Sequence, residues 1–182
     1  MPHNTFVVDN QTIVASILLI VSVSMAAWAM GTPTWVVNNF SGKTRFGLSK
    51  LCIIFEGEKP DDEQCEDFQP PPLWSLTLIF IAVGIILMIL AVLMLVMSLW
   101  RRNSEKAARL SSFFGIMFFV LAAIAFPFGF DVPEIGGSPY RLPANTRVGY
   151  SYFLFCSSIL VSTVAVMLCN SEVIRRGIFR NI

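Results

Sequence analysis

Residues 73–100 read LWSLTLIFIAVGIILMILAVLMLVMSLW, a stretch that contains no Asp, Glu, Lys or Arg. A helix of about 20 apolar residues crosses the roughly 30 Å of hydrocarbon in a bilayer, because each residue adds about 1.5 Å of rise. The alternation of apolar and polar residues that marks a strand is absent, and an open sheet cannot satisfy its backbone hydrogen bonds in lipid. The stretch therefore predicts a membrane-spanning helix.

Three further stretches have the same character, namely residues 13–30, 110–130 and 150–169. All 13 basic and 12 acidic residues lie outside the four stretches. The chain is 55% hydrophobic and only 14% charged, which excludes intrinsic disorder, and its net charge of +1 lacks the basic footprint of a nucleic-acid binder. We expect a single domain over residues 1–182, an all-α membrane protein folded as a left-handed four-helix bundle.

The first apolar stretch has an alternative interpretation as a cleaved signal peptide. Ala27-Trp28-Ala29 resembles a small-x-small cleavage site at the end of a hydrophobic segment. A signal peptide begins with a basic region, whereas residues 1–12 contain no Lys or Arg. We therefore expect this segment to remain as the first helix.

Four basic residues between the second and third stretches determine the predicted orientation: Arg101, Arg102, Lys106 and Arg109. Short cytoplasmic loops of membrane proteins are enriched in Lys and Arg. We expect segment 101–109 and both termini in the cytoplasm, residues 31–72 and 131–149 outside the cell, and the protein in the plasma membrane. Binding of the four side chains to lipids of the inner leaflet is a second interpretation.

The first outer segment predicts a small β-sheet closed by a disulfide. Cys52 and Cys65 lie in the compartment where disulfides persist, and closing a loop of this length stabilises by about 3 kcal/mol. Residues 34–37 and 45–55 are expected to form a hairpin, and residues 56–67 an exposed acidic loop. Asn39 begins the sequence Asn-Phe-Ser, a glycosylation site if this segment is outside.

Aromatic and small residues predict where the helices meet the membrane surface and each other. Six aromatic residues are expected near the outer interface, with ordinary packing as the alternative for each: Trp28, Trp35, Trp74, Tyr140, Tyr150 and Tyr152. Trp100 would mark the inner interface. Small residues four positions apart predict close helix packing at Ser22/Ala26, Ala27/Gly31, Ser111/Gly115, Ala125/Gly129 and Ser158/Ser162.

The sequence offers no residues for catalysis, for a metal site or for a cofactor. His3 is the only histidine, so a histidine-based triad or a multi-histidine metal site cannot form within one chain. The predicted helices carry no ionisable Asp, Glu, Lys or Arg of the kind that transporters and pumps use. The acidic residues between 56 and 67 are read as a solvated face. We predict a non-enzymatic protein that acts by contact with other membrane proteins.

The first outer segment resembles that of the claudin and peripheral-myelin-protein superfamily. The matching residues are Trp35, Gly47-Leu48, Cys52 and Cys65, which follow that superfamily's order of W, then G-L-W-x-x-C, then C. Ser49 stands where the second Trp of the pattern is expected. The resemblance implies a claudin-like four-span fold with a small extracellular sheet.

The second half of the chain resembles the modulator of Smoothened family. The resemblance extends over residues 74–155 and rests on Trp100-Arg101-Arg102, on residues 123–130, and above all on residues 134–146, EIGGSPYRLPANT. It implies a negative regulator of Hedgehog signalling that lowers Smoothened at the cell surface and primary cilium. It also implies action together with a multiple-EGF-domain receptor and a RING ubiquitin ligase.

The second outer segment is the predicted partner-binding surface. Glycines permit unusual backbone conformations there, prolines stiffen the path, and a Tyr-Arg pair offers residue types that anchor interfaces. The residues are Glu134, Gly136, Gly137, Pro139, Tyr140, Arg141 and Pro143. The alternative is that this loop caps the sheet of the first segment. Two other functions also stay open, a claudin-like junction or adhesion protein and an auxiliary subunit of a channel or receptor.

Overall fold

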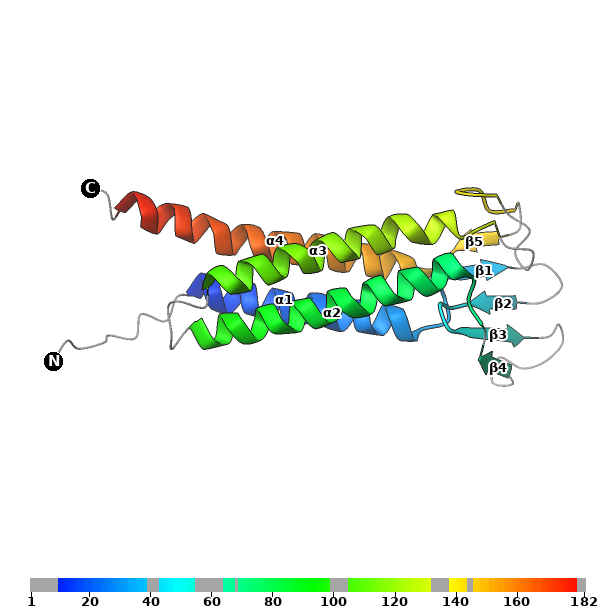
Figure 1. Cartoon of the computed structure of the whole chain (residues 1–182). Helices are drawn as coiled ribbons and strands as arrows, with labels where there is room; N and C mark the ends of the chain where they lie inside the picture. Colours follow the sequence, from blue (N-terminus) through cyan, green and yellow to red (C-terminus); the bar gives the residue numbers. More distant parts are fainter. Residues whose placement is uncertain are drawn as a thin grey trace.

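Four long helices lie side by side in an elongated bundle, and a small sheet covers one end of it (Figure 1). The structure is a computed structural model that describes residues 10–38, 43–54, 64–67, 69–98, 105–131, 138–143 and 146–179. The helices are α1 (Asn10–Gly31), α2 (Pro72–Ser98), α3 (Glu105–Phe128) and α4 (Tyr150–Phe179). Each is long and apolar enough to cross a membrane. The expected four-helix membrane bundle with a small sheet is confirmed.

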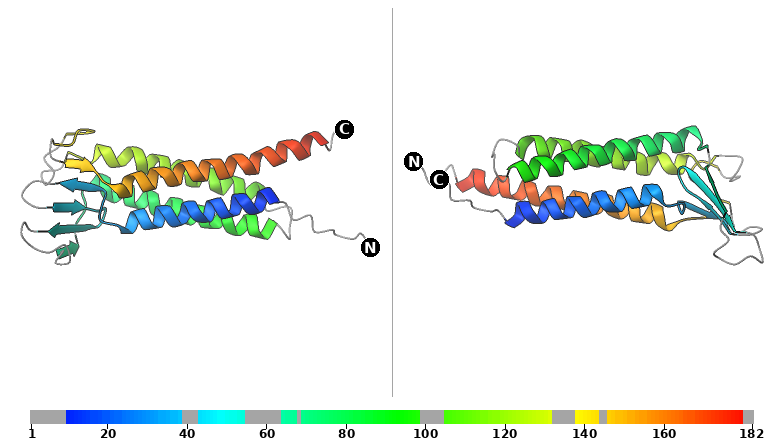
Figure 2. Two further views of the ribbon diagram at one scale, coloured as in Figure 1. Left: turned by 180° about the vertical axis from the view of Figure 1, so that it is seen from behind. Right: turned by 90° about the horizontal axis from the view of Figure 1, so that it is seen from below.

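The helix ends differ from those expected, most clearly in α4. This helix continues to Phe179, ten residues past the apolar stretch, and α3 begins at Glu105 rather than at 110. Hydropathy marks the part of a helix that suits lipid, whereas backbone hydrogen bonding continues until a residue stops it, and residues 170–179 contain no proline. The start of α1 and the end of α4 lie at the same end of the bundle, opposite the sheet (Figures 1 and 2).

The helices associate as two close pairs, α1 with α4 and α2 with α3. Ser22 of α1 donates a hydrogen bond of 2.8 Å from its hydroxyl to the Ser158 carbonyl of α4. Between α2 and α3, a Cβ added at Gly115 would lie 3.4 Å from the Gly84 carbonyl oxygen. Small residues therefore let each pair of backbones approach closely, as the spacing of Ser111/Gly115 and Ser158/Ser162 predicts.

The sheet has five strands in the order β4-β3-β2-β1-β5, and every neighbouring pair is antiparallel. The strands run roughly along the long axis of the bundle, so the sheet extends across that axis (Figure 1). Their bounds are β1 (Val36–Asn38), β2 (Lys43–Phe46), β3 (Lys50–Ile54), β4 (Gln64–Asp67) and β5 (Thr146–Val148). The last strand lies between α3 and α4 in the chain, and it pairs with β1, which lies between α1 and α2.

Two details of the predicted sheet are wrong, and a third concerns an alternative that the sequence left open. The expected single strand over residues 45–55 is two strands, because the chain turns back at Leu48-Ser49 and the Gly47 N–H donates to the Lys50 carbonyl at 2.7 Å. The expected loop over 56–67 ends in strand β4. The sheet also continues into residues 146–148, where the alternative interpretation of the second segment is correct: part of this segment completes the sheet.

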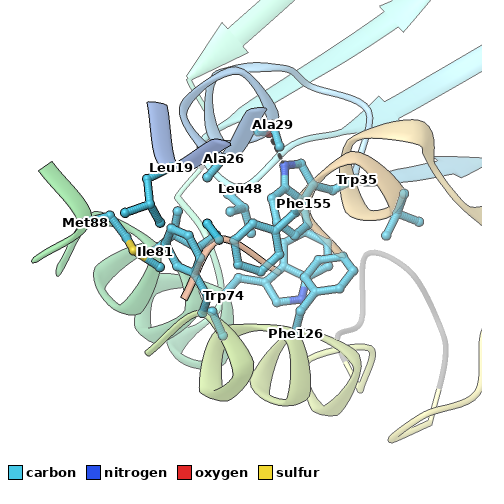
Figure 3. Close-up of a cluster of buried hydrophobic side chains, with 14 of the residues drawn as sticks. Leu19, Ala26, Ala29, Trp35, Leu48, Trp74, Ile81, Met88, Phe126 and Phe155 are labelled. Atoms are coloured by element: carbon cyan, nitrogen blue, oxygen red, sulfur yellow. Dashed lines mark hydrogen bonds between the residues drawn. The ribbon is translucent and has the colours of Figure 1, made fainter. Parts of the chain in front are cut away.

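The inner face of the sheet packs on an aromatic cluster at the end of the bundle (Figure 3). Alternate strand residues supply that face, namely Val36, Phe46, Leu51 and Val148. The cluster below contains Trp35, Trp74, Phe126 and Phe155, all fully buried. This cluster connects the sheet with both helix pairs.

For two members of the expected aromatic band, the alternative of ordinary packing is correct. Trp35 and Trp74 are fully buried, since each fills the space between helix ends and the sheet. Trp28 and Tyr150 are each 68% exposed and stay candidates for the membrane interface. Trp100 lies outside the described residues.

Candidate interaction surface at the sheet end

Trp35 ties the start of the sheet to the end of α1. Its indole N–H donates a hydrogen bond of 2.7 Å to the Ala29 carbonyl, one of the last four carbonyls of the helix, which have no partner within it. The ring also contacts Phe126 edge-on at 4.9 Å and Phe155 at 5.8 Å between centroids. This residue of the claudin-like motif therefore has a structural role that links α1, α3 and α4.

Gly47 and Leu48 fix the turn between β2 and β3 against the same region. A Cβ at position 47 would lie 2.8 Å from the Pro33 Cα atom, so only glycine fits without a shift of the backbone. Leu48 is fully buried in the cluster below the sheet. The motif's second part thus holds the β2–β3 turn close to the chain that leaves α1.

The expected disulfide between Cys52 and Cys65 is present and joins β3 to β4. The two residues lie directly opposite each other in the ladder, with 4.1 Å between their Cα atoms. All four residues of β4 are exposed, so the strand has little apolar burial of its own. The disulfide and the ladder hydrogen bonds hold β4 on the sheet.

Pro127 interrupts the hydrogen bonding of α3 just before the helix ends. Proline lacks the N–H that would bond to the carbonyl four residues earlier, which is that of Ala123. The Tyr152 hydroxyl of α4 donates to this carbonyl at 3.0 Å. The Tyr140 backbone N–H donates to the carbonyl of Pro127 itself, also at 3.0 Å. Tyr152 and the backbone of Tyr140 together therefore satisfy two carbonyls at the end of α3.

Residues 138–141 form a tight turn that rests on this helix end. Ser138 and Arg141 exchange two backbone hydrogen bonds of 2.8 and 2.9 Å. Tyr140 has a positive φ of 61°, a conformation that costs free energy in residues other than glycine. Its ring packs edge-on against the Phe128 ring, with 4.3 Å between the ring centroids, yet the residue is 53% exposed. The turn thus presents Tyr140 while both its backbone and its ring are held by α3.

The structure describes only part of the predicted partner-binding set. Pro139, Tyr140 and Arg141 are exposed together on the turn, and Pro143 is half-buried between the turn and β5. Glu134, Gly136 and Gly137 lie outside the described residues, as does the predicted glycosylation site Asn39. The supporting residues Phe128, Pro127 and Tyr152 were not predicted, and a proline near a helix end is the one sequence signal that points to them.

The opposite end of the bundle carries the described basic residues of the predicted cytoplasmic segment. Lys106 is exposed and Arg109 is half-buried in the first turns of α3, whereas Arg101 and Arg102 lie outside the described residues. The sheet and this basic helix start are separated by the full length of the bundle (Figure 2). Among the residues that the structure describes, no three His, Cys, Asp or Glu side chains gather as ligands for a metal ion.

The fold and the sheet end define a class of protein: a multi-pass membrane protein in which strands from two segments between helices form one sheet at one end of the bundle. Comparison with protein families then identifies the group within this class. Residues 32–175 match the family described as Attenuator of Hedgehog, and since this is most of the chain, the protein belongs to that family. The match agrees with the resemblance to the modulator of Smoothened family. It includes the sheet, the aromatic cluster and the Tyr140 turn.

Proposed function

We propose that this attenuator of Hedgehog signalling is a non-catalytic membrane adaptor that lowers the amount of Smoothened at the cell surface and primary cilium. Membership of the family indicates that the pathway is Hedgehog signalling. The mechanism would be protein contact in the membrane, with a multiple-EGF-domain receptor and a cytosolic RING ubiquitin ligase as the partners that remove Smoothened. The protein would provide the binding surface, and the ubiquitin ligase would provide the catalysis.

The single observation that supports this mechanism best is the exposed turn at residues 138–141. Tyr and Arg are enriched among the residues that dominate binding energy in interfaces. Two backbone hydrogen bonds close the turn, and a third fixes it to the Pro127 carbonyl. A preorganised loop loses little conformational entropy when it binds, so Tyr140 and Arg141 are well placed to anchor a partner.

The proposed orientation puts the sheet outside the plasma membrane and both termini in the cytoplasm. Three observations support it: α1 begins and α4 ends at one end of the bundle, the disulfide lies at the other, and basic residues lie at the start of α3. In this orientation Asn39 would be available for glycosylation. Arg101, Arg102, Lys106 and Arg109 would face the cytoplasm and its anionic lipids.

A rescue experiment tests the adaptor mechanism. Cells that lack the gene would receive wild-type protein or the double variant Tyr140→Ser, Arg141→Ala, and surface Smoothened would be measured by biotinylation. We expect the wild type to lower surface Smoothened and the double variant to fail, although it reaches the surface. The matched control is Tyr150→Ser with Lys50→Ala, which removes an exposed Tyr and an exposed basic residue from the same end of the bundle.

Two outcomes would contradict the proposal. One is an unchanged level of surface Smoothened in cells with and without the wild-type protein, which would refute the mechanism as a whole. The other is full rescue by the double variant at the turn, which would place the partner contact elsewhere on the molecule.

A further inference from the structure

The sheet ends in two edge strands of different composition. In the described part of the chain, β4 and β5 each pair on one side only, with β3 and β1 respectively. Because the sheet extends across the long axis of the bundle, its two edges face sideways (Figure 1). In a membrane that lies perpendicular to this axis, both edges therefore face neighbouring proteins at the same height.

Both edges direct backbone groups outward. Hydrogen-bonded and non-hydrogen-bonded pairs alternate along an antiparallel ladder. Because Gly149 donates to the Trp35 carbonyl, the Val148 N–H and C=O point away from β1. In β4 the short Cα distance at Cys65 is that of a non-hydrogen-bonded pair, so the backbone groups of Cys65 and Asp67 point away from β3. On β5 the outward Thr146 N–H already donates to the Pro143 carbonyl at 3.0 Å, so this edge offers the N–H and C=O of Val148. Edge groups of this kind accept a further strand.

The two edges carry opposite charges. Arg147 is the exposed charged residue of β5, whereas β4 carries Glu66 and Asp67, both exposed. The sheet has an outer face, which is the face that points away from the aromatic cluster. The register places Arg147 on this face, together with Cys52 and Cys65. Asp67 lies two residues from Cys65 and so on the same outer face. An edge pair of β5 with β4 would bring these opposite charges together, whereas two like edges would bring like charges together.

The directions of the strands fit a contact between neighbouring copies. Four successive antiparallel pairings mean that β2, β4 and β5 run in the same direction. All copies in one membrane have the same orientation, so β5 of one copy faces β4 of the next as a parallel pair. Like charges directly opposite each other in a sheet are destabilising, which disfavours β4 with β4 and β5 with β5.

We propose that a second copy of this chain docks edge to edge in the same membrane, with its β4 paired to β5 of the first copy and Asp67 beside Arg147. This contact joins two different surfaces, so it can repeat from copy to copy. The proposal goes beyond the attenuator function, and neither of the two depends on the other. Asp67 lies opposite Lys50 within its own sheet, and in the pair it would lie between two basic side chains.

Charge exchange tests the contact. Full-length copies with different fluorescent labels would be expressed together, and energy transfer between them would be measured in intact cells. The Arg147→Asp variant in all copies should lose the transfer, and so should Asp67→Arg, because each places like charges at the edge pair. The combination of both changes in one chain should restore it, because the charges are then exchanged. The control for folding is formation of the Cys52–Cys65 disulfide in each variant.

A photo-crosslinking residue at Gln64 of β4 gives a second measurement that leaves both edge charges intact. We expect a covalent dimer whose crosslinked peptide contains residues 146–148, and no dimer when the same residue is placed at Lys50 of the inner strand β3. Transfer that is unchanged in both single variants would overturn the proposal. If the combined variant stays low, the crosslink decides: a peptide from β5 supports the contact, and no dimer or another peptide refutes it.

Discussion

The hydrogen bond from Tyr152 to the Ala123 carbonyl allows a test of how the sheet end is held together. Pro127 deprives this carbonyl of its usual helix partner, and the Tyr152 hydroxyl replaces that partner from α4 at 3.0 Å. The change Tyr152→Phe keeps the ring, which stacks on Phe126 at 5.1 Å between centroids, and removes only the hydroxyl. The change removes the hydrogen bond to Ala123 together with the contact between the hydroxyl and the Cys156 thiol of the same helix, so a single variant does not isolate the bond.

The expected loss of stability is about 1 kcal/mol. Hydrogen bonds between membrane helices contribute about 0.6 kcal/mol on average and at most about 1.7, and an unsatisfied buried carbonyl adds to the cost. The bond is only partly buried, which keeps the estimate below the upper value. A change of this size shifts the equilibrium constant of unfolding about fivefold.

A double-mutant cycle separates this bond from other effects of the hydroxyl. The change Pro127→Ala restores a backbone N–H four residues after Ala123, which can take up the carbonyl within the helix. In that background Tyr152→Phe should cost less than about 0.5 kcal/mol, so the two changes should couple by about 0.5–1 kcal/mol. The free energies would be measured by reversible unfolding in mixed micelles titrated with sodium dodecyl sulfate.

Additive free energies would refute this reasoning. If Tyr152→Phe costs the same with Pro127 and with Ala at that position, the hydroxyl does not replace the missing helix hydrogen bond. A cost near zero in the wild-type background would lead to the same conclusion.

Two further changes test the packing at the sheet end. A methyl group at Gly129 would overlap the Trp74 ring, so Gly129→Ala should lower the free energy of unfolding by about 1–3 kcal/mol. Gly31→Ala has open space around it and should change that free energy by less than about 0.5 kcal/mol; equal effects at the two glycines would contradict the packing. Replacing Cys52 and Cys65 by Ser should cost about 2–4 kcal/mol and leave no difference in mobility between reduced and unreduced protein on a gel.

The four helices could be predicted from the sequence because lipid excludes charge so strongly. Their ends could not, since a helix continues past the apolar stretch wherever its backbone bonds continue, as α4 does to Phe179. The disulfide was predictable from the predicted side of the membrane. The burial of Trp35 and Trp74 was not, because composition does not distinguish an aromatic residue at the lipid surface from one between helix ends.

The sequence contains little that predicts the strands at the two edges of the sheet. Residues 64–67 read QCED, with no β-branched or aromatic residue, and they form β4 because the disulfide and the ladder with β3 place them there. Residues 146–148 are too short for a periodic pattern, and they pair with a strand more than a hundred positions earlier. The candidate site was likewise predicted only as a segment, because its support comes from contacts of Tyr140 with Pro127 and Phe128 of α3, which lie more than ten positions earlier in the chain.

The central claim of this account is that the sheet lies outside the membrane and the basic start of α3 inside. The direct measurement is labelling of single cysteines with a membrane-impermeant thiol reagent, in a background that lacks Cys156 and Cys169. Lys50→Cys on the sheet should react in intact cells, and Lys106→Cys should react only after the membrane is permeabilised. Labelling of Lys106→Cys in intact cells, with Lys50→Cys protected, would contradict the orientation and with it the proposed outer binding surface.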